Sequence, residues 1–402
     1  MGRTDRANSN AGPGVCIIVE NNTVPPDRRV WREARALTAS GYRVCVICPK
    51  GRGFERSHET IDGIEIYRHS LWTGSGFAGY FVEYTWALLM EFILAVRLCF
   101  RYRFRILHAC NPPDNIFLIA LALRLFGVRF VFDQHDPFPE FFEARFGRGG
   151  IVRRFVELAE KWTFRAAHAT IVTNESCRDL AVGRGGVSPN RCFVVRNCPS
   201  LKDFPPRPAQ PELKRGFRHM VVYVGIMGSQ DGINLLVDSV RHIVQDKGRR
   251  DTLFVLIGPG PEAIAQESRA NALGLQPWIH FTGPLYGDDL RAYMATADVG
   301  VSPDPINVFN DKITMIKIFE YMACGLPVVL YDLQEGRKAA GGAALYAKDN
   351  SPIDLAEQID QLLESEPLRR RLGEIGKERI LSGLNWESET KSLLAAYDVA
   401  SA

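Results

Sequence analysis

The chain has 402 residues, more than one ordinary hydrophobic core organises, so two domains are expected. Its net charge is only +3, which excludes the strong positive field of a nucleic-acid-binding protein. The nine cysteines lack the spacing of a secreted disulfide framework, and Cys45 and Cys48 fall on opposite faces of a predicted strand. We therefore expect buried thiols and a reducing, cytoplasmic compartment.

The first part of the chain predicts one domain over residues 15–200. Residues 1–14 are polar and lack an apolar signal core, so we expect a disordered lead. Strands then alternate with helices, which indicates a parallel sheet covered on both faces. The expected strands are 15–20, 43–49, 105–109, 129–133 and 169–173, with a hairpin over 61–68. The expected helices are 27–40, 76–100, 115–126 and 151–167, with a short one after Asn174.

The stretch from Gly76 to Phe100 is the most membrane-like part of the chain. Glu83, Glu91 and Arg97 interrupt it, so a spanning helix is not expected. A buried core helix is the favoured interpretation. The alternative is a helix on an anionic membrane surface, supported by an arginine-rich end at positions 97, 101, 103 and 105.

The second part of the chain predicts a second domain. Five prolines between Asn197 and His219 indicate an interdomain linker, which we place at 201–219. A new strand–helix series over 220–385 follows, and a helix over 386–402 that can cross back to the first domain closes the chain. Its expected strands include 220–225, 252–257, 278–282 and 327–331. Its expected helices include 233–245, 261–273, 287–295, 353–363 and 367–381. The fold class is therefore α/β, with two doubly wound, Rossmann-like domains that face a cleft.

The segment from Ala297 to Tyr331 is the most informative about function. A short apolar strand leads through a loop rich in Pro, Asp and Asn into a helix that carries Lys317 and Glu320. A helix N-terminus behind such a loop can bind a phosphate, and a glutamate one to two turns further can bind a ribose. The segment predicts a nucleotide-linked substrate.

Several motifs resemble those of the retaining glycosyltransferases of family 4, which have the two-domain GT-B fold. FEYMACGLPVV at 319–329 resembles the second half of the family's Glu-x7-Glu motif. Further matching pieces are GIMGSQDG at 225–232, IGPGPE at 257–262, FTG at 281–283 and HDPFPE at 135–140. The resemblance extends from Val15 to Val399. It implies transfer of a hexose from a nucleotide diphosphate sugar, with retention and with no metal, and no zinc-type spacing is present in the sequence.

The resemblance assigns Glu320 as the second glutamate of the motif, whose carboxylate accepts hydrogen bonds from the donor ribose. A surface ion pair between Glu320 and Lys317 is the structural alternative. The first glutamate of the motif is replaced by Lys312, which cannot accept a hydrogen bond. Either Asp311 takes over that contact, or Lys312 turns toward the donor phosphates.

The predicted donor site also departs from the family in its cations. Relatives carry an arginine and a lysine in the loop where this chain has Met227 and Asp231. Because the leaving diphosphate needs positive charge nearby, we expect Lys312 and Lys317 to supply that charge. In the alternative, one of the two is only a solvated lysine. The site is completed by Gly225, Gly228 and Gly258 and by the backbone N–H groups near Met315 and Ile316.

The first domain is expected to hold the acceptor and a polar catalytic group. His135 follows a predicted buried strand, so His135 and Asp136 are our catalytic candidates together with Lys317, and Glu140 is their support. In the alternative, Asp136 caps the loop and His135 only makes structural hydrogen bonds. The acceptor candidates follow other strands of the sheet and are Asn22, Asp27, Arg28, Arg29, Asn111 and Asp114.

Two alternatives to these acceptor roles remain open. Asp27 can cap the helix that follows it. Arg32 and Arg35 can belong to a plain solvated face, whereas a basic helix start would suit an anionic acceptor such as a lipid diphosphate sugar.

The resemblance implies a bacterial maker of surface polysaccharide that uses a nucleotide sugar and a lipid-linked or other glycan acceptor. It would lie in the cytoplasm, with peripheral association to the inner face of the cytoplasmic membrane. Two rival functions use the same scaffold: a nucleotide-sugar 2-epimerase and a non-catalytic nucleotide-sugar-binding protein.

Overall fold

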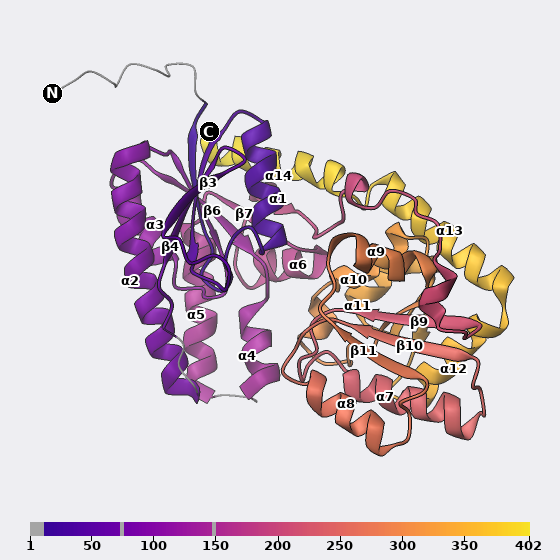
Figure 1. The fold of residues 1–402 in the computed structure, drawn as a ribbon. Coiled ribbons are helices and arrows are strands. Elements are labelled where there is room, and N and C mark those ends of the chain that lie inside the picture. The colour runs from indigo at the N-terminus through magenta and orange to yellow at the C-terminus, as the bar shows by residue number, and fades with distance from the viewer. Residues whose placement is uncertain (1–11, 73–75, 147–149) are drawn as a thin grey trace. The chain divides into compact units, whose positions relative to one another are not determined.

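The computed structural model describes residues 12–72, 76–146 and 150–402 (Figure 1). Most of the expected disordered lead therefore lies outside the described residues. The chain divides into two compact units. Unit 1 contains the chain up to residue 196 together with residues 390–402, and unit 2 contains residues 197–389. The segment expected as a linker belongs to unit 2, where two short 3-10 turns cover Leu201–Asp203 and Pro211–Lys214.

The sheet of unit 1 has eight strands in the order β3-β4-β2-β1-β5-β6-β7-β8. All neighbours are parallel except β3 and β4, which form the expected hairpin with Asp62 and Gly63 at positive φ. The strands are β1 (Gly14–Ile18), β2 (Arg43–Pro49), β3 (His58–Ile61), β4 (Ile64–His69), β5 (Ile106–Cys110), β6 (Arg129–Gln134), β7 (Ala169–Val172) and β8 (Cys192–Val194).

Helices cover both faces of this sheet. They are α1 (Arg28–Ala39), α2 (Gly76–Tyr102), α3 (Phe117–Arg124), α4 (Phe138–Phe146), α5 (Gly150–Ala166), α6 (Glu175–Gly183) and α14 (Trp386–Ser401). Alternate strand residues such as Leu107 and Phe132 point into one core with α2, α3 and α5. Cys45 and Cys48 are buried free thiols, as predicted.

Helix α2 is buried along one side only. Ala87, Ala95 and Leu98 face the core, whereas Leu89 and Phe100 are exposed. The favoured interpretation of a buried core helix therefore holds for the inner side of α2 and not for its outer side. No helix of the described residues has the length and apolar content needed to cross a membrane.

Unit 2 has six parallel strands in the order β11-β10-β9-β12-β13-β14. The strands are β9 (His219–Val224), β10 (Thr252–Ile257), β11 (Ile279–Gly283), β12 (Val299–Ser302), β13 (Val328–Tyr331) and β14 (Ala344–Ala347). The helices are α7 (Ile233–Arg241), α8 (Ala263–Ala272), α9 (Gly287–Thr296), α10 (Ile316–Ala323), α11 (Gln334–Ala340), α12 (Pro352–Glu364) and α13 (Glu366–Ser382).

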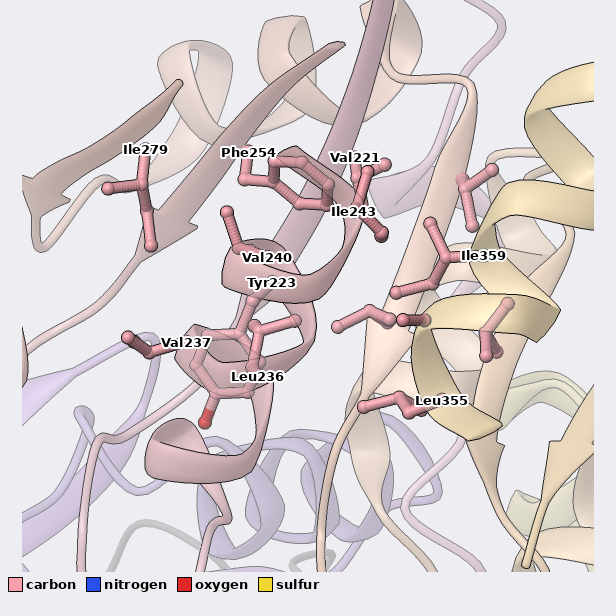
Figure 2. Packing of buried hydrophobic residues seen from close by; sticks show 14 of the residues in the cluster. Val221, Tyr223, Leu236, Val237, Val240, Ile243, Phe254, Ile279, Leu355 and Ile359 are labelled. Carbon is pink, nitrogen blue, oxygen red and sulfur yellow. The ribbon is translucent and has the colours of Figure 1, made fainter. Parts of the chain in front are cut away.

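Two cores lie on opposite faces of this sheet because strand side chains alternate. Val221 and Tyr223 of β9 pack with α7 and α12 on one face, as Figure 2 shows. Met220 and Val222 belong to the other core, which includes Phe319 of α10. Each unit is thus a parallel α/β layer structure, and the prediction of two doubly wound domains is confirmed.

Candidate active site

Two loops of unit 2 meet backbone to backbone at the carboxyl ends of β9 and β10. A Cβ on Gly258, which has φ 144°, would lie 1.8 Å from the carbonyl oxygen of Gly225. A Cβ on Gly260 would lie 2.3 Å from the carbonyl oxygen of Met227. The N–H of Met227 donates to the carbonyl oxygen of Pro259 at 2.8 Å. Only glycine allows this approach, so the loops present backbone rather than side chains at the sheet edge.

Helix α10 carries Lys317 and Glu320, the two residues that the segment from Ala297 to Tyr331 predicts for the donor site. Its N-cap, Met315, has an extended backbone and makes no side-chain capping bond, and Ile316 is exposed. Lys317 and Glu320 are only 8% and 5% exposed. A surface ion pair between these two residues is therefore excluded, and Glu320 is a buried carboxylate less than two turns from the helix start.

The ammonium of Lys317 is held by a partner that the sequence did not predict. Its Nζ lies 2.9 and 3.0 Å from the two carboxylate oxygens of Asp304, which follows β12. It also lies over the Tyr223 ring, 4.8 Å from the centroid. Burial opposes the charged form, yet the carboxylates of Asp304 and Asp231 raise the pKa of Lys317. Lys317 is thus a cation beside the Gly225 loop, with its charge already paired.

The other departures from the family motif have local structural roles. Asp311 accepts the backbone N–H of Gln334 at 2.8 Å, at the start of α11, and Lys312 lies 3.3 Å from the Gln334 side-chain oxygen. Met227 is fully buried. Asp231 accepts the Gly228 N–H at 2.8 Å and so shapes its own loop.

Unit 1 places a buried ionic cluster at the carboxyl end of β6. Asp133 accepts from Arg29 Nη2 at 2.6 Å and from Arg29 Nε at 2.9 Å, and Arg29 also donates to the carbonyl of Val195 at 2.8 Å. Glu33 lies 3.2 Å from Arg29 Nε. Arg29 is therefore buried, and the expectation that it adds to an exposed basic helix start is wrong, whereas Arg28 is exposed.

Two histidines surround the same carboxylate. His135 Nε2 lies 2.7 Å from Asp133 Oδ2, and His108 Nε2 lies 3.5 Å from the same oxygen. His108 Nδ1 bonds the hydroxyl of Tyr397 at 2.8 Å. Burial opposes protonation of His135, but the charge of Asp133 outweighs it and raises the pKa of His135. Burial, together with Asp133, raises the pKa of Glu33 to about 7.

Asn111 organises the loop that contains His135. Its side-chain oxygen accepts from the N–H of His135 at 2.7 Å and of Asp136 at 3.3 Å. Its side-chain nitrogen donates to Asp114 Oδ1 at 2.9 Å and to the carbonyl of Asp136 at 2.8 Å. Asn111 and Asp114 are both buried, so the structure gives them a framework role. Burial raises the pKa of Asp136.

The remaining candidates of unit 1 also have local partners. Glu140 pairs with Arg184, whose Nη1 lies 2.6 Å away, so it holds α4 rather than supporting His135. Asp27 caps α1 by accepting the Val30 N–H at 3.0 Å, as the alternative predicted. Asn22 is exposed and accepts the Thr23 N–H at 2.9 Å.

Two family models match the chain, one in each unit. Residues 26–198 match the glycosyl transferase 4-like domain, and residues 218–365 match the model of glycosyl transferases group 1. The chain belongs to the glycosyltransferase superfamily. Its fold is GT-B.

Curated relatives of this glycosyltransferase act on different substrates. The D-inositol 3-phosphate glycosyltransferase of Geodermatophilus obscurus is 29% identical over 57% of this chain and 51% of its own. The MMP α-(1→4)-mannosyltransferase of Mycolicibacterium hassiacum is 26% identical over 70% of this chain and 67% of its own. The matches thus span about half to two thirds of these relatives.

Solved structures share the fold of the glycosyltransferase. Sucrose-phosphate synthase of Thermosynechococcus elongatus has a TM-score of 0.78 at 18% identity and covers 96% of this chain and 98% of that one. The Anabaena protein HepE, solved in complex with UDP-glucose, has a TM-score of 0.71 at 13% identity over 96% and 99% of the two chains.

The glycosyltransferase also holds three potential metal ligands together. Among the described residues, His108, Cys110 and Asp133 have ligand atoms within 4.8 Å of one another. Arg29 already bonds both oxygens of Asp133, so the positive charge that a metal would bring is supplied by a guanidinium. The residues therefore fit an ionic network better than a metal site.

The sequence-predicted candidates thus fall into two groups. Glu320, Lys317 and the donor-loop glycines gather at one sheet edge of unit 2, and His135 lies with Asn111 at one sheet edge of unit 1. Sequence reasoning missed Asp133 and Asp304 as ionic partners. Their signal was position, because each comes at or just after the end of a buried strand.

Proposed function

We propose that the protein transfers a hexose, with retention, from a uridine diphosphate sugar to a lipid-linked glycan acceptor in cell-surface polysaccharide biosynthesis. The observation that carries the proposal is the buried carboxylate of Glu320 on α10, behind an uncapped helix start. Uridine is supported by the relation to HepE, which was solved with UDP-glucose. The polysaccharide setting is supported by the surface-polysaccharide resemblance of the α10 segment and by WaaG, a lipopolysaccharide glycosyltransferase of the same fold.

In this proposal the donor lies across the glycine loops and the start of α10. Glu320 accepts the ribose hydroxyls, because one carboxylate can take two hydroxyl donors. The diphosphate lies against the backbone of the loops at Gly225 and Gly258, which pack closely on each other. The N–H groups near Met315 and Ile316, with the helix dipole, face its negative charge.

The reaction proposed is attack of an acceptor hydroxyl oxygen on the anomeric carbon. The bond from that carbon to the diphosphate oxygen breaks on the same face, and the hydroxyl proton passes to the leaving diphosphate. Negative charge grows on the diphosphate in the transition state, and in this proposal the Lys317 cation beside the Gly225 loop stabilises it while Asp304 holds the ammonium in position. His135, whose pKa is raised by the charge of Asp133 against the effect of burial, is the proposed polar catalytic group of unit 1.

A lipid-linked acceptor requires the enzyme to work at the membrane that holds it. The proposed location is therefore the cytoplasm, with peripheral association to the inner face of the cytoplasmic membrane. In this proposal Asn22 and Arg28, which are exposed near the start of α1, contact the acceptor.

One experiment separates this function from its rivals. The protein is screened against UDP-, GDP- and dTDP-sugars by thermal shift, since a donor raises the midpoint by mass action. The stabilising donor is then incubated with a short-chain lipid diphosphate sugar, and products are followed by proton NMR of the anomeric centre. Acceptor-dependent UDP release with retained configuration supports the proposal. Free epimerised sugar indicates the 2-epimerase, and binding with no turnover indicates the non-catalytic protein.

A further inference from the structure

Exposed apolar side chains gather on three helices of unit 1. Single exposed hydrophobic residues are ordinary, but a contiguous group marks an interaction surface. Phe155 is 65% exposed, Phe100 64% and Leu125 86%. The complete group has six members on α2, four on or just after α3 and three on α5: Val82, Trp86, Leu89, Phe92, Ile93, Phe100, Leu118, Leu121, Leu125, Phe126, Phe155, Leu158 and Trp162. We name this group the apolar face.

The spacing of these residues gives each helix an outward stripe. Trp86, Leu89 and Ile93 follow one another at intervals of three and four along α2. Phe155, Leu158 and Trp162 do the same along α5. Residues three and four apart lie on one side of a helix, so each stripe is continuous.

The three stripes lie on one side of unit 1. The buried sides of α2, α3 and α5 contribute to a single core on one face of the sheet. Helix α3 contacts both α2 and α5. Phe100 and Phe126 touch edge to face at 5.2 Å and so join two of the stripes directly.

The fully exposed charges on these three helices have one sign. In the described parts of α2, α3 and α5, each exposed charged residue is an arginine, at positions 97, 101, 124, 154 and 165. None of the carboxylates of these helices is fully exposed in the described residues: Glu91 and Glu160 are buried, Glu83 is half-buried, and the half-buried Glu157 pairs with Arg153 at 2.9 Å. Most of the arginines lie near the C-terminal ends of the helices, where Arg103 and Arg105 are also exposed.

We propose that the apolar face is a docking surface for an anionic phospholipid bilayer, with α2, α3 and α5 lying in the lipid interface and their arginines on the lipid phosphates. Bulky apolar side chains flanked by arginines are the composition of an interfacial membrane surface. Trp86 and Trp162 suit the headgroup level, where amphipathic indole rings concentrate. The surface involves three helices and not α2 alone.

The charges argue against a second copy of the chain as the occupant. A two-fold dimer through this face would bring arginine against arginine, because the same patch meets itself. Like charges at an interface are unfavourable, whereas lipid phosphates neutralise them. The proposal deepens the peripheral membrane association of the proposed function, rests on this surface, and does not depend on the glycosyl transfer itself.

The test is flotation of the full chain with vesicles of phosphatidylcholine, with or without phosphatidylglycerol, at low and high salt. We expect binding to the anionic vesicles at low salt that weakens as salt screens the arginines. An apolar variant combines Leu89→Gln, Leu125→Gln, Phe155→Gln and Trp162→Gln. A basic variant combines Arg97→Gln, Arg101→Gln, Arg124→Gln and Arg165→Gln. Each arginine near an anionic surface strengthens binding roughly fivefold, so the basic variant should bind at least about tenfold more weakly. The apolar variant should also bind at least about tenfold more weakly, because binding scales with the apolar area that enters the lipid interface.

A matched control carries the same kind of change at exposed apolar residues of unit 2, namely Ile264→Gln, Ile353→Gln and Leu381→Gln. It should float like the wild type. Brominated lipids should quench tryptophan fluorescence in the wild type and less in a Trp86→Phe, Trp162→Phe variant. UDP-induced thermal shift in the same samples reports donor binding and should not change between variants.

Three results would overturn the proposal. The first is no flotation of the wild type with anionic vesicles at low salt. The second is an equal loss of binding in the control variant. The third is wild-type self-association in sedimentation velocity that the apolar variant abolishes, which would make this face an interface between copies.

Discussion

At the scale of single residues, buried charge in unit 1 is concentrated around Asp133. Arg29 bonds both of its oxygens, and His135 bonds one of them at 2.7 Å. Burial works against the charged carboxylate, yet Arg29 and His135 hold the pKa of Asp133 well below its usual value. The Asp133 carboxylate is therefore held in its charged form, and breaking one of its pairs leaves a buried charge without compensation.

Replacing His135 tests this cluster through pH. The folded pKa of His135 is raised, so its stabilising pair with Asp133 is complete below the unfolded pKa and is lost as pH rises through the folded pKa. His135→Gln should therefore lower the free energy of unfolding more at about pH 6 than at about pH 9. Urea unfolding of the full chain at both pH values measures the difference.

A second histidine supplies a control of opposite sign. Burial lowers the pKa of His280 in unit 2, so its protonation costs stability as pH falls. His280→Gln should thus lower the free energy of unfolding less at the lower pH than at the higher pH. If the His135→Gln loss is the same at both pH values, His135 and Asp133 are not paired as charges.

The Lys317–Asp304 pair predicts a coupling in unit 2. Lys317→Met leaves the buried carboxylate of Asp304 without its cation, and Asp304→Asn leaves the buried ammonium of Lys317 without this carboxylate. Each substitution should lower the free energy of unfolding by about 3–5 kcal/mol. The double variant should cost less than the sum of the two, because neither charge remains. Urea unfolding completes the cycle. Additive losses would show that the two side chains do not interact.

At the scale of elements, the donor loops depend on glycine. Gly260→Ala would place a Cβ 2.3–2.6 Å from three backbone atoms of Met227, so the two loops must separate. We expect a loss of about 1–3 kcal/mol in stability together with weaker UDP binding. Gly183→Ala is the control, since nothing lies within 4 Å of its Cβ, and it should stabilise α6 by up to about 1 kcal/mol. Thermal unfolding with and without UDP measures both, and unchanged UDP binding in Gly260→Ala would contradict this role.

The long periodic elements of both units could be predicted from the sequence. Strand β2 and strand β10 have the predicted bounds, because their apolar runs are bordered by turn residues. The elements missed were α4, α11, β8 and β14, which are short and lack a distinctive period. The sequence left open whether α2 is a core helix or a surface helix, because a continuous apolar run hides which side meets the core.

At the scale of the whole molecule, the chain returns to its first unit. Residues 390–402 belong to unit 1, and Tyr397 is fully buried there with its hydroxyl 2.8 Å from His108 Nδ1. His108 and Tyr397 are 289 residues apart in the sequence, and Arg29 and Asp133 are 104 residues apart. No local pattern encodes such partners, so the resemblance predicted the fold and only part of the site.

Tyr397→Phe tests whether the C-terminal residues stabilise unit 1 through the contact with His108. It removes the partner of a buried His108 nitrogen and should destabilise unit 1 by about 1–3 kcal/mol. Hydrogen exchange should rise at β1 and β5 and stay unchanged in the strands of unit 2. Tyr286→Phe, at a residue 67% exposed, is the matched control and should change neither unit. Equal exchange in Tyr397→Phe and the wild type would contradict the prediction.

The central claim is that a nucleoside diphosphate sugar binds at α10 with its ribose on Glu320. Calorimetric affinities of UDP and 2′-deoxy-UDP for the wild type, Glu320→Gln and the exposed control Glu378→Gln test it most directly. The wild type and the control should prefer UDP by about tenfold or more, because the analogue leaves a buried carboxylate short of a partner. Glu320→Gln should bind UDP about 10- to 100-fold more weakly and lose most of that preference. Wild-type affinity and preference in Glu320→Gln would contradict the claim.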